Sequence, residues 1–245
     1  MRRLLVLASA AACAGAIGIA PVAAGPSGDV ARFCDLNFEV SQLFNRAPDE
    51  DASDEEIQEF QQELYALLDE AASIAPPEIA AQVSSAVAAL RADLDAAFED
   101  PAVQEASQAI DQWAVANCGY QTADVTGIEY EFDGIPKTLQ TGRTAFNFTN
   151  DGAELHDLVV FRIKTDTPVK KLLKLPDRKV EKQVQEIGAT FALQGESAVA
   201  YLDLKKPGRY AAVCFVPVGS IDPEEEVDGP PHAEEGMVFE FRVKR

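Results

Sequence analysis

The sequence predicts an α+β protein with two domains, a helical bundle followed by a β-sandwich. In residues 29–119, apolar residues recur at helical spacing between segments that contain proline. Residues 121–245 instead contain strand patterns separated by turns. Residues 1–24 precede both domains and read as an export signal.

The export signal is predicted from the three parts of a secretory signal peptide. Arg2-Arg3 is followed by an apolar run and by small residues that end with Ala24. We therefore expect a mature protein of the periplasm, the cell envelope or the medium. The alternative is lipid attachment at Cys13, ranked second because the apolar run continues past it. Nothing after residue 24 is long and apolar enough to span a bilayer.

Four antiparallel helices are expected in residues 29–119, with breaks at residues 47–53, at Pro76-Pro77 and at Asp100-Pro101. Ser53-Asp-Glu-Glu56 is a capping box that starts the second helix. The apolar positions of the third helix run from Ile79 to Phe98. Short connections favour an up-down-up-down bundle.

Three cysteines remain once the signal is removed: Cys34, Cys118 and Cys214. In a bundle of four alternating helices, the start of the first and the end of the fourth lie at the same end, so we expect a Cys34–Cys118 disulfide. Three cysteines allow three pairings, and the sequence alone does not exclude the other two. If this pair forms, Cys214 is left as a thiol.

A potential metal site follows from His156, Cys214, His232 and Met237, which include both histidines and the one methionine beyond Met1. A thiolate and two imidazoles with a weak axial thioether suit copper. His156 starts a hydrophobic strand after an Asn-Asp-Gly turn, and Cys214 ends a strand that follows Gly208. The alternative for Cys214 is a buried, inert thiol.

These motifs resemble the plastocyanin-type cupredoxins. The matching pieces are the Asn-rich turn before His156, the Gly208-x-Tyr210-x-x-x-Cys214 strand, and the His232-x-x-x-x-Met237 spacing. The resemblance covers residues 121–245. It implies a Greek-key β-sandwich that holds one copper ion for electron transfer. It also implies equatorial ligands His156, Cys214 and His232 and an axial ligand Met237.

One departure from that family is the distance between Cys214 and His232. Here 17 residues, Phe215 to Pro231, intervene, where plastocyanin-like proteins have only a few. The insertion can loop out between Pro217 and Pro231, because closure entropy grows only logarithmically with length. The alternative function is a cupredoxin-like binding module that is metal-free or stores copper.

Charge limits the partners. Residues 25–120 contain 20 acidic and 3 basic side chains, and residues 121–245 contain 21 and 16. Such a field repels nucleic acid and anionic membranes. A redox partner of unknown identity, possibly basic, remains. The acidic run Asp222–Asp228 is either its docking patch or a solvated, mobile loop.

The sequence does not predict an enzyme. Both histidines are assigned to the metal, and no pair of carboxylates is singled out by its spacing. No internal repeat suggests a second copper domain. The basic clusters, residues 170–174 and 177–182, are expected to form a charged loop and a short helix between strands.

Overall fold

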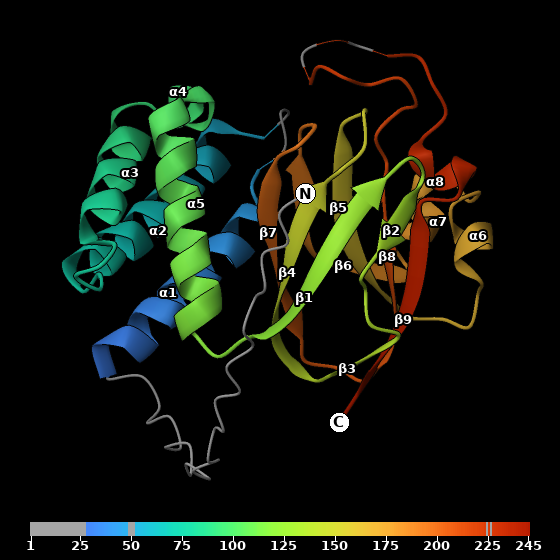
Figure 1. Ribbon diagram of the computed structural model, residues 1–245, viewed down its shortest axis with the longest axis horizontal. Helices are drawn as coiled ribbons and strands as arrows, with labels where there is room; N and C mark the ends of the chain where they lie inside the picture. Colours follow the sequence, from blue (N-terminus) through green and yellow to red (C-terminus); the bar gives the residue numbers. More distant parts are fainter. Residues whose placement is uncertain (1–27, 49–51, 224, 226) are drawn as a thin grey trace, which may run out of the picture.

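The computed structural model describes residues 28–48, 52–223, 225 and 227–245. The expected export signal and Cys13 lie outside the described residues. Helices come first and a sandwich of two sheets follows, with the helices beside one face of the sandwich (Figure 1). The first helices are α1 (Gly28–Phe44), α2 (Asp54–Ser73), α3 (Ala80–Ala92), α4 (Leu94–Glu99) and α5 (Pro101–Asn117).

The expected four-helix bundle is not confirmed, because the third helix is broken in two. Asp93 ends α3 and caps α4, with an extended backbone and a side chain that accepts a hydrogen bond from the N–H of Ala96. A short carboxylate that bonds the backbone ahead of it competes with helix continuation. The capping box between Ser53 and Glu56 is present at the start of α2, as predicted.

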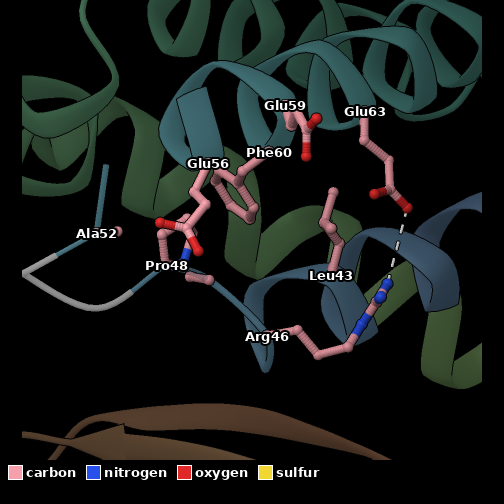
Figure 2. Close-up of a pocket in the computed structure, with 9 residues that line it drawn as sticks. Leu43, Arg46, Pro48, Ala52, Glu56, Glu59, Phe60 and Glu63 are labelled. Carbon is pink, nitrogen blue, oxygen red and sulfur yellow. Dashed lines mark ion pairs between the residues drawn. The ribbon is translucent and has the colours of Figure 1, made fainter. Parts of the chain in front are cut away.

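The helices share one apolar core, in which α1 packs against α2 and α3 packs against α2 and α5. Near the end of α1 the packing leaves an open pocket between α1 and α2 (Figure 2). Phe60 projects from α2 toward Leu43 in this pocket, and Arg46 lies 3.7 Å from the carboxylate of Glu63.

The sandwich consists of a four-stranded sheet, in the order β2-β1-β4-β7, and a five-stranded sheet, in the order β3-β9-β8-β5-β6. Its strands are β1 (Gln121–Ile128), β2 (Glu131–Asp133), β3 (Thr138–Gln140), β4 (Gly142–Asn150), β5 (His156–Ile163), β6 (Val184–Ala192), β7 (Ser197–Leu204), β8 (Gly208–Val213) and β9 (Val238–Lys244). Alternate residues of both sheets fill one core that includes Phe146, Leu158 and Tyr210. β1 and β4 pair in parallel, with Gly127 opposite Asn150.

Two short helices, α6 (Val169–Leu172) and α7 (Asp177–Val180), connect β5 to β6, where the basic clusters were expected. Val169 and Leu172 are buried, while the lysines beside them are exposed. α6 and α7 lie on the side of the sandwich away from α1–α5 (Figure 1). Among the described helices, none has the length and apolar composition needed to cross a bilayer.

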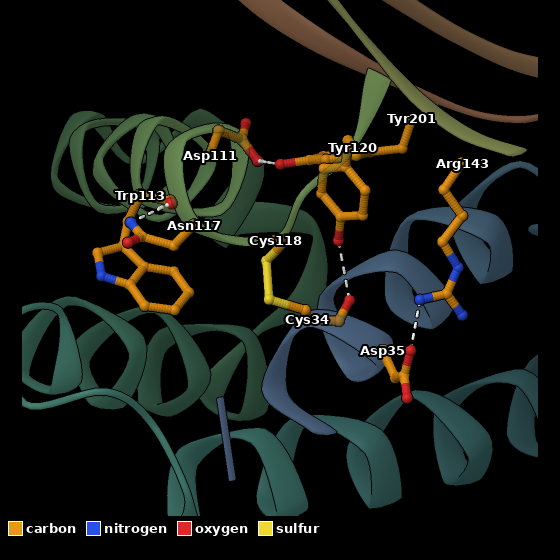
Figure 3. Close-up of a disulfide and its surroundings, with 9 residues drawn as sticks. All are labelled: Cys34, Asp35, Asp111, Trp113, Asn117, Cys118, Tyr120, Arg143 and Tyr201. Carbon is orange, nitrogen blue, oxygen red and sulfur yellow. Dashed lines mark hydrogen bonds and ion pairs between the residues drawn. A yellow bond between two sulfur atoms is a disulfide. The ribbon is translucent and has the colours of Figure 1, made fainter. Parts of the chain in front are cut away.

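The Cys34–Cys118 disulfide is present and joins α1 to the end of α5 (Figure 3). The hydroxyl of Tyr120 donates to the carbonyl of Cys34, 2.9 Å away, so the same point is tied to the first residues of the sandwich. Phe38, Ala114 and Tyr201 pack together where the helices meet β4 and β7. The guanidinium of Arg143 in β4 pairs with Asp35 of α1.

Removing the disulfide should destabilise the protein. The sulfurs join residues separated by 84 positions. In the chain-entropy model a loop of this length contributes about 4 to 5 kcal/mol, an upper figure because native strain subtracts from it. We expect C34A/C118A to lower the free energy of unfolding by up to that amount in urea denaturation. An unchanged midpoint and slope would contradict this expectation.

Asp111 should make stability depend on pH. Its carboxylate accepts a hydrogen bond from Tyr201, 2.8 Å away, yet burial raises the pKa of Asp111 to about 7. The unfolded chain loses this proton near pH 4, while the folded chain keeps it to about 7. The free energy of unfolding should therefore fall as pH rises through this window.

Asp111→Asn keeps an acceptor for Tyr201 and removes the titration. We expect the difference in unfolding free energy between the two proteins to grow in favour of the variant from pH 4 to pH 8. Urea titrations at four or five pH values measure it. Parallel pH profiles for both proteins would mean that Asp111 titrates alike in the folded and unfolded chains.

Candidate metal centre

His156 is held by the turn that joins β4 to β5. Asn150 is fully buried, and its amide nitrogen donates to the carbonyls of Glu154 and Ala192, at 2.7 and 2.9 Å. Its side-chain oxygen accepts the N–H of Gly152 at 2.9 Å. The Asn-Asp-Gly signal therefore marks a loop whose backbone polar groups are satisfied inside the protein, with His156 at its end as the first residue of β5.

Cys214 follows β8 directly, and a short helix, α8 (His232–Glu235), returns the chain to it. The N–H of Ala233 donates to the carbonyl of Cys214, and the N–H of Cys214 donates to that of Met237. Met237 in turn donates its N–H to the carbonyl of His232 at 3.0 Å. The backbones of these three site residues are thus bonded to one another, directly or through one neighbour.

The insertion between Cys214 and His232 loops out as the sequence allowed. Pro217 and Pro231 form an antiparallel bridge, and the N–H of Val218 donates to the carbonyl of Pro230 at 2.9 Å. The N–H of His232 donates to the carbonyl of Val216 at the same distance. These contacts, between residues 216–218 and 230–232, close the base of the insertion. His232 therefore lies next to the strand segment that contains the cysteine, as it would after a short loop.

The three side chains converge. The Nδ1 atoms of His156 and His232 lie 3.0 Å apart, and the sulfur of Cys214 lies 4.0 and 3.3 Å from them, respectively. All three residues are fully buried. Within the described part of the chain, they are the one group of three or more His, Cys, Asp or Glu side chains whose donor atoms come close enough to hold a metal ion.

Met237 is also fully buried and is placed by the same backbone bonds. Gly127 in β1 makes room for it, since a Cβ there would lie 3.3 Å from the methyl carbon of Met237 and 3.0 Å from the ring of Phe148. Met237 thus lies at the end of the sandwich where β1 passes close to the site. Its role as the axial ligand stays a prediction.

A carboxylate stands behind His232. Glu154 Oε2 lies 3.0 Å from His232 Nε2, and Glu154 also accepts the hydroxyl of Tyr130 at 3.1 Å and the N–H of Gly219. Burial opposes ionisation of Glu154, but these hydrogen bonds outweigh it and lower its pKa. Because a carboxylate only accepts, Nε2 of His232 is the donor in this contact, which leaves Nδ1 facing the cluster.

A second carboxylate, that of Glu129, lies behind His156. Its Oε1 is 3.5 Å from His156 Nε2 and accepts the N–H groups of Ala153 and Glu154. Burial opposes its ionisation, but these backbone donors prevail and the pKa of Glu129 is lowered. Gly152 is essential to this approach, because a Cβ there would lie 2.3 Å from Glu129 Oε1 and 2.7 Å from His156 Nε2.

The electrostatics favour neutral ligands in the absence of a cation. Burial, together with the nearby His232, lowers the pKa of His156, so this imidazole stays unprotonated. Burial, reinforced by the carboxylate of Asp157, raises the pKa of the Cys214 thiol. Asp157 is oriented by the N–H of Phe215, 2.9 Å from its Oδ1. A thiolate at this position therefore needs a cation beside it.

The donor set fits a metal ion by its chemistry. The two Nδ1 atoms and the sulfur lie within 4.0 Å of one another, and the outer nitrogen of His156, Nε2, is buried without a hydrogen-bond partner. With the ring hydrogen of His156 on Nε2, facing Glu129, the inner nitrogens and the sulfur are free to bind one cation. Two imidazoles and a thiolate form the trigonal set of a type 1 copper site. The cluster points to a single copper ion.

Sequence reasoning missed Glu129, Tyr130, Glu154 and Asp157. Glu154 and Asp157 flank His156 within two residues, so their proximity to it was a usable signal. Glu129 lies 27 positions upstream, where no local pattern marks it. It reaches His156 because the parallel pairing of β1 with β4 ends both strands at the same edge.

The fold and the cluster define a β-sandwich protein with a mononuclear copper-type ligand set. Among solved structures, similar proteins include an auracyanin from the photosynthetic bacterium Roseiflexus castenholzii, at 19% identity and a TM-score of 0.33, covering 51% of this chain and 98% of that one. Auracyanin A, a "blue" copper protein from Chloroflexus aurantiacus, is 16% identical, with a TM-score of 0.34 and coverage of 51% and 100%.

A multicopper oxidase from Aquifex aeolicus is 13% identical, with a TM-score of 0.31, and the match spans 52% of this chain but 30% of the oxidase. No protein-family model matches this chain, and no curated protein matches it. Similarity at this level does not assign a metal, which makes the donor atoms themselves the basis for the copper assignment.

Gly152→Ala should disturb the site without replacing a ligand residue. The new Cβ would displace the Glu129 carboxylate and press on the His156 ring. Loss of such an outer partner typically costs 10- to 100-fold in metal affinity, so we expect a drop on the order of tenfold. Competition titration with Cu(II) measures it, and Gly28→Ala, whose Cβ would meet nothing within 4 Å, is the control. Equal affinities for the two variants would contradict the assigned role of Gly152.

Proposed function

We propose that this protein is an exported electron carrier with one blue-copper ion held by His156, Cys214 and His232, with Met237 as the axial ligand. The observation that supports it most is the convergence of two imidazole lone pairs and a thiol in a fully buried site. When bound, copper supplies a one-electron couple. The residues of the chain fix the ligand geometry and exclude water from it.

Export is supported by the signal-like residues 1–24 and by the Cys34–Cys118 disulfide, since disulfides persist in oxidising compartments. The redox partner is unidentified. The multicopper oxidases combine several such domains, and the described residues contain one sandwich with one His-Cys-His cluster. A carrier of single electrons is thus the simplest function for the site.

The first test is a Cu(II) titration of the mature protein followed by visible spectroscopy. A thiolate-to-copper charge-transfer band should appear at one equivalent, bleach on addition of one electron and return on reoxidation. Cys214→Ser should abolish the band, because the charge transfer starts from the thiolate sulfur and a serine hydroxyl cannot replace it. Met237→Leu, a matched control of similar volume, should retain it, because only the weak axial donor is lost.

Three results would separate the alternatives. A protein that binds no copper is a metal-free binding module. One that binds copper without the band, or whose band does not cycle with one electron, is a storage site and not a carrier. A band that survives Cys214→Ser would place the metal elsewhere in the chain.

A further inference from the structure

The two carboxylates behind the imidazoles are built into the site. The side chain of Glu154 is 17% exposed and that of Glu129 is 30% exposed. Each has a negative charge within 3.0 or 3.5 Å of the outer nitrogen of a different ligand ring. Both pairs lie at one end of the sandwich, and every ring involved is fully buried.

Both carboxylates are held in place by donors other than the histidines. Tyr130 and the N–H of Gly219 hold Glu154, and the ring of Tyr130 also packs on that of His232, with centroids 4.8 Å apart. Two backbone N–H groups hold Glu129, and Gly152 leaves the space it needs. The negative charges are therefore fixed before any metal arrives, in contrast to mobile surface acids.

Charge at this distance discriminates between oxidation states. A carboxylate hydrogen-bonded to a ligand imidazole raises the basicity of that ligand. Its field also favours the ion with the higher positive charge, and it acts strongly because water is excluded from the cluster.

We propose that Glu129 and Glu154 are positioning residues that make this site favour Cu(II) over Cu(I), so that the protein has a lower reduction potential than its ligand set alone would give. The inference rests on the proposed copper function. The contribution of Glu154 exceeds that of Glu129, because Glu154 bonds its imidazole directly while Glu129 stands 3.5 Å away.

Charge-removing variants of the copper-loaded protein test this inference. Glu154→Gln keeps a carbonyl oxygen to accept the His232 N–H but loses the charge. We expect its reduction potential to rise by about 59 mV, which corresponds to a tenfold lower ratio of Cu(II) to Cu(I) affinity for a one-electron couple. Glu129→Gln should shift the potential in the same direction by less. Glu131→Gln, an exposed acid on neighbouring β2, is the control and should leave it unchanged.

A spectroelectrochemical titration reads the potential, and the charge-transfer band reports whether the ligands remain in place. Unchanged potentials in both glutamine variants, with the band intact, would overturn the inference. The two carboxylates would then only hold the loops in place through their hydrogen bonds. An equal rise in Glu131→Gln would also overturn it, because general surface charge would then be the cause.

A second measurement separates this inference from the proposed function. If the wild-type protein has no charge-transfer band but binds metal, competition titrations with Zn(II) and Cu(I) replace the potential. Glu154→Gln should then weaken Zn(II) more than Cu(I), by about tenfold in the ratio, and an unchanged ratio overturns the inference. A wild-type protein that binds neither ion removes both the proposed function and the inference.

Discussion

The metal cluster depends on a few backbone hydrogen bonds that close the segment from Cys214 to Met237. The bonds between Val216 and His232, Cys214 and Ala233, and Met237 and Cys214 bring the thiol, the second imidazole and the thioether residue together. Without these hydrogen bonds, nothing in the backbone would hold His232 next to the sheet after so long an insertion. The two strands that flank the segment, β8 and β9, pair along their length, so the closed segment is continuous with the five-stranded sheet.

A second constraint comes from strand direction. The parallel pair of β1 and β4 ends both strands at one edge, which places Glu129 beside the turn that presents His156. The outer carboxylates therefore derive from topology, whereas the ligands derive from local sequence. A change of register between β1 and β4 would leave the order of the ligands along the chain unchanged, but it would move the carboxylate of Glu129 relative to His156.

The same distinction explains what the sequence could predict. His156 and Cys214 were predictable because each lies at the end of a hydrophobic strand, His156 as the first residue of β5 and Cys214 directly after β8. The Cys34–Cys118 pair was predictable from helix order. The break at Asp93 was missed, because the apolar spacing continues from Leu90 to Leu94 while one carboxylate recaps the backbone. Glu129 was missed because its partner is distant in sequence, so that only the strand pairing relates them.

The separation of charge along the molecule has a consequence for encounters in solution. Residues 25–120, which contain α1–α5, have a net charge of −17, against −5 for residues 121–245. These helices lie across the sandwich from α6, α7 and α8, the last of which begins at His232 (Figure 1). The protein is thus an electric dipole whose negative end points away from the metal ligands. A strongly cationic protein is drawn first to the helical end, which is remote from the cluster, and must then reorient to reach the metal ligands.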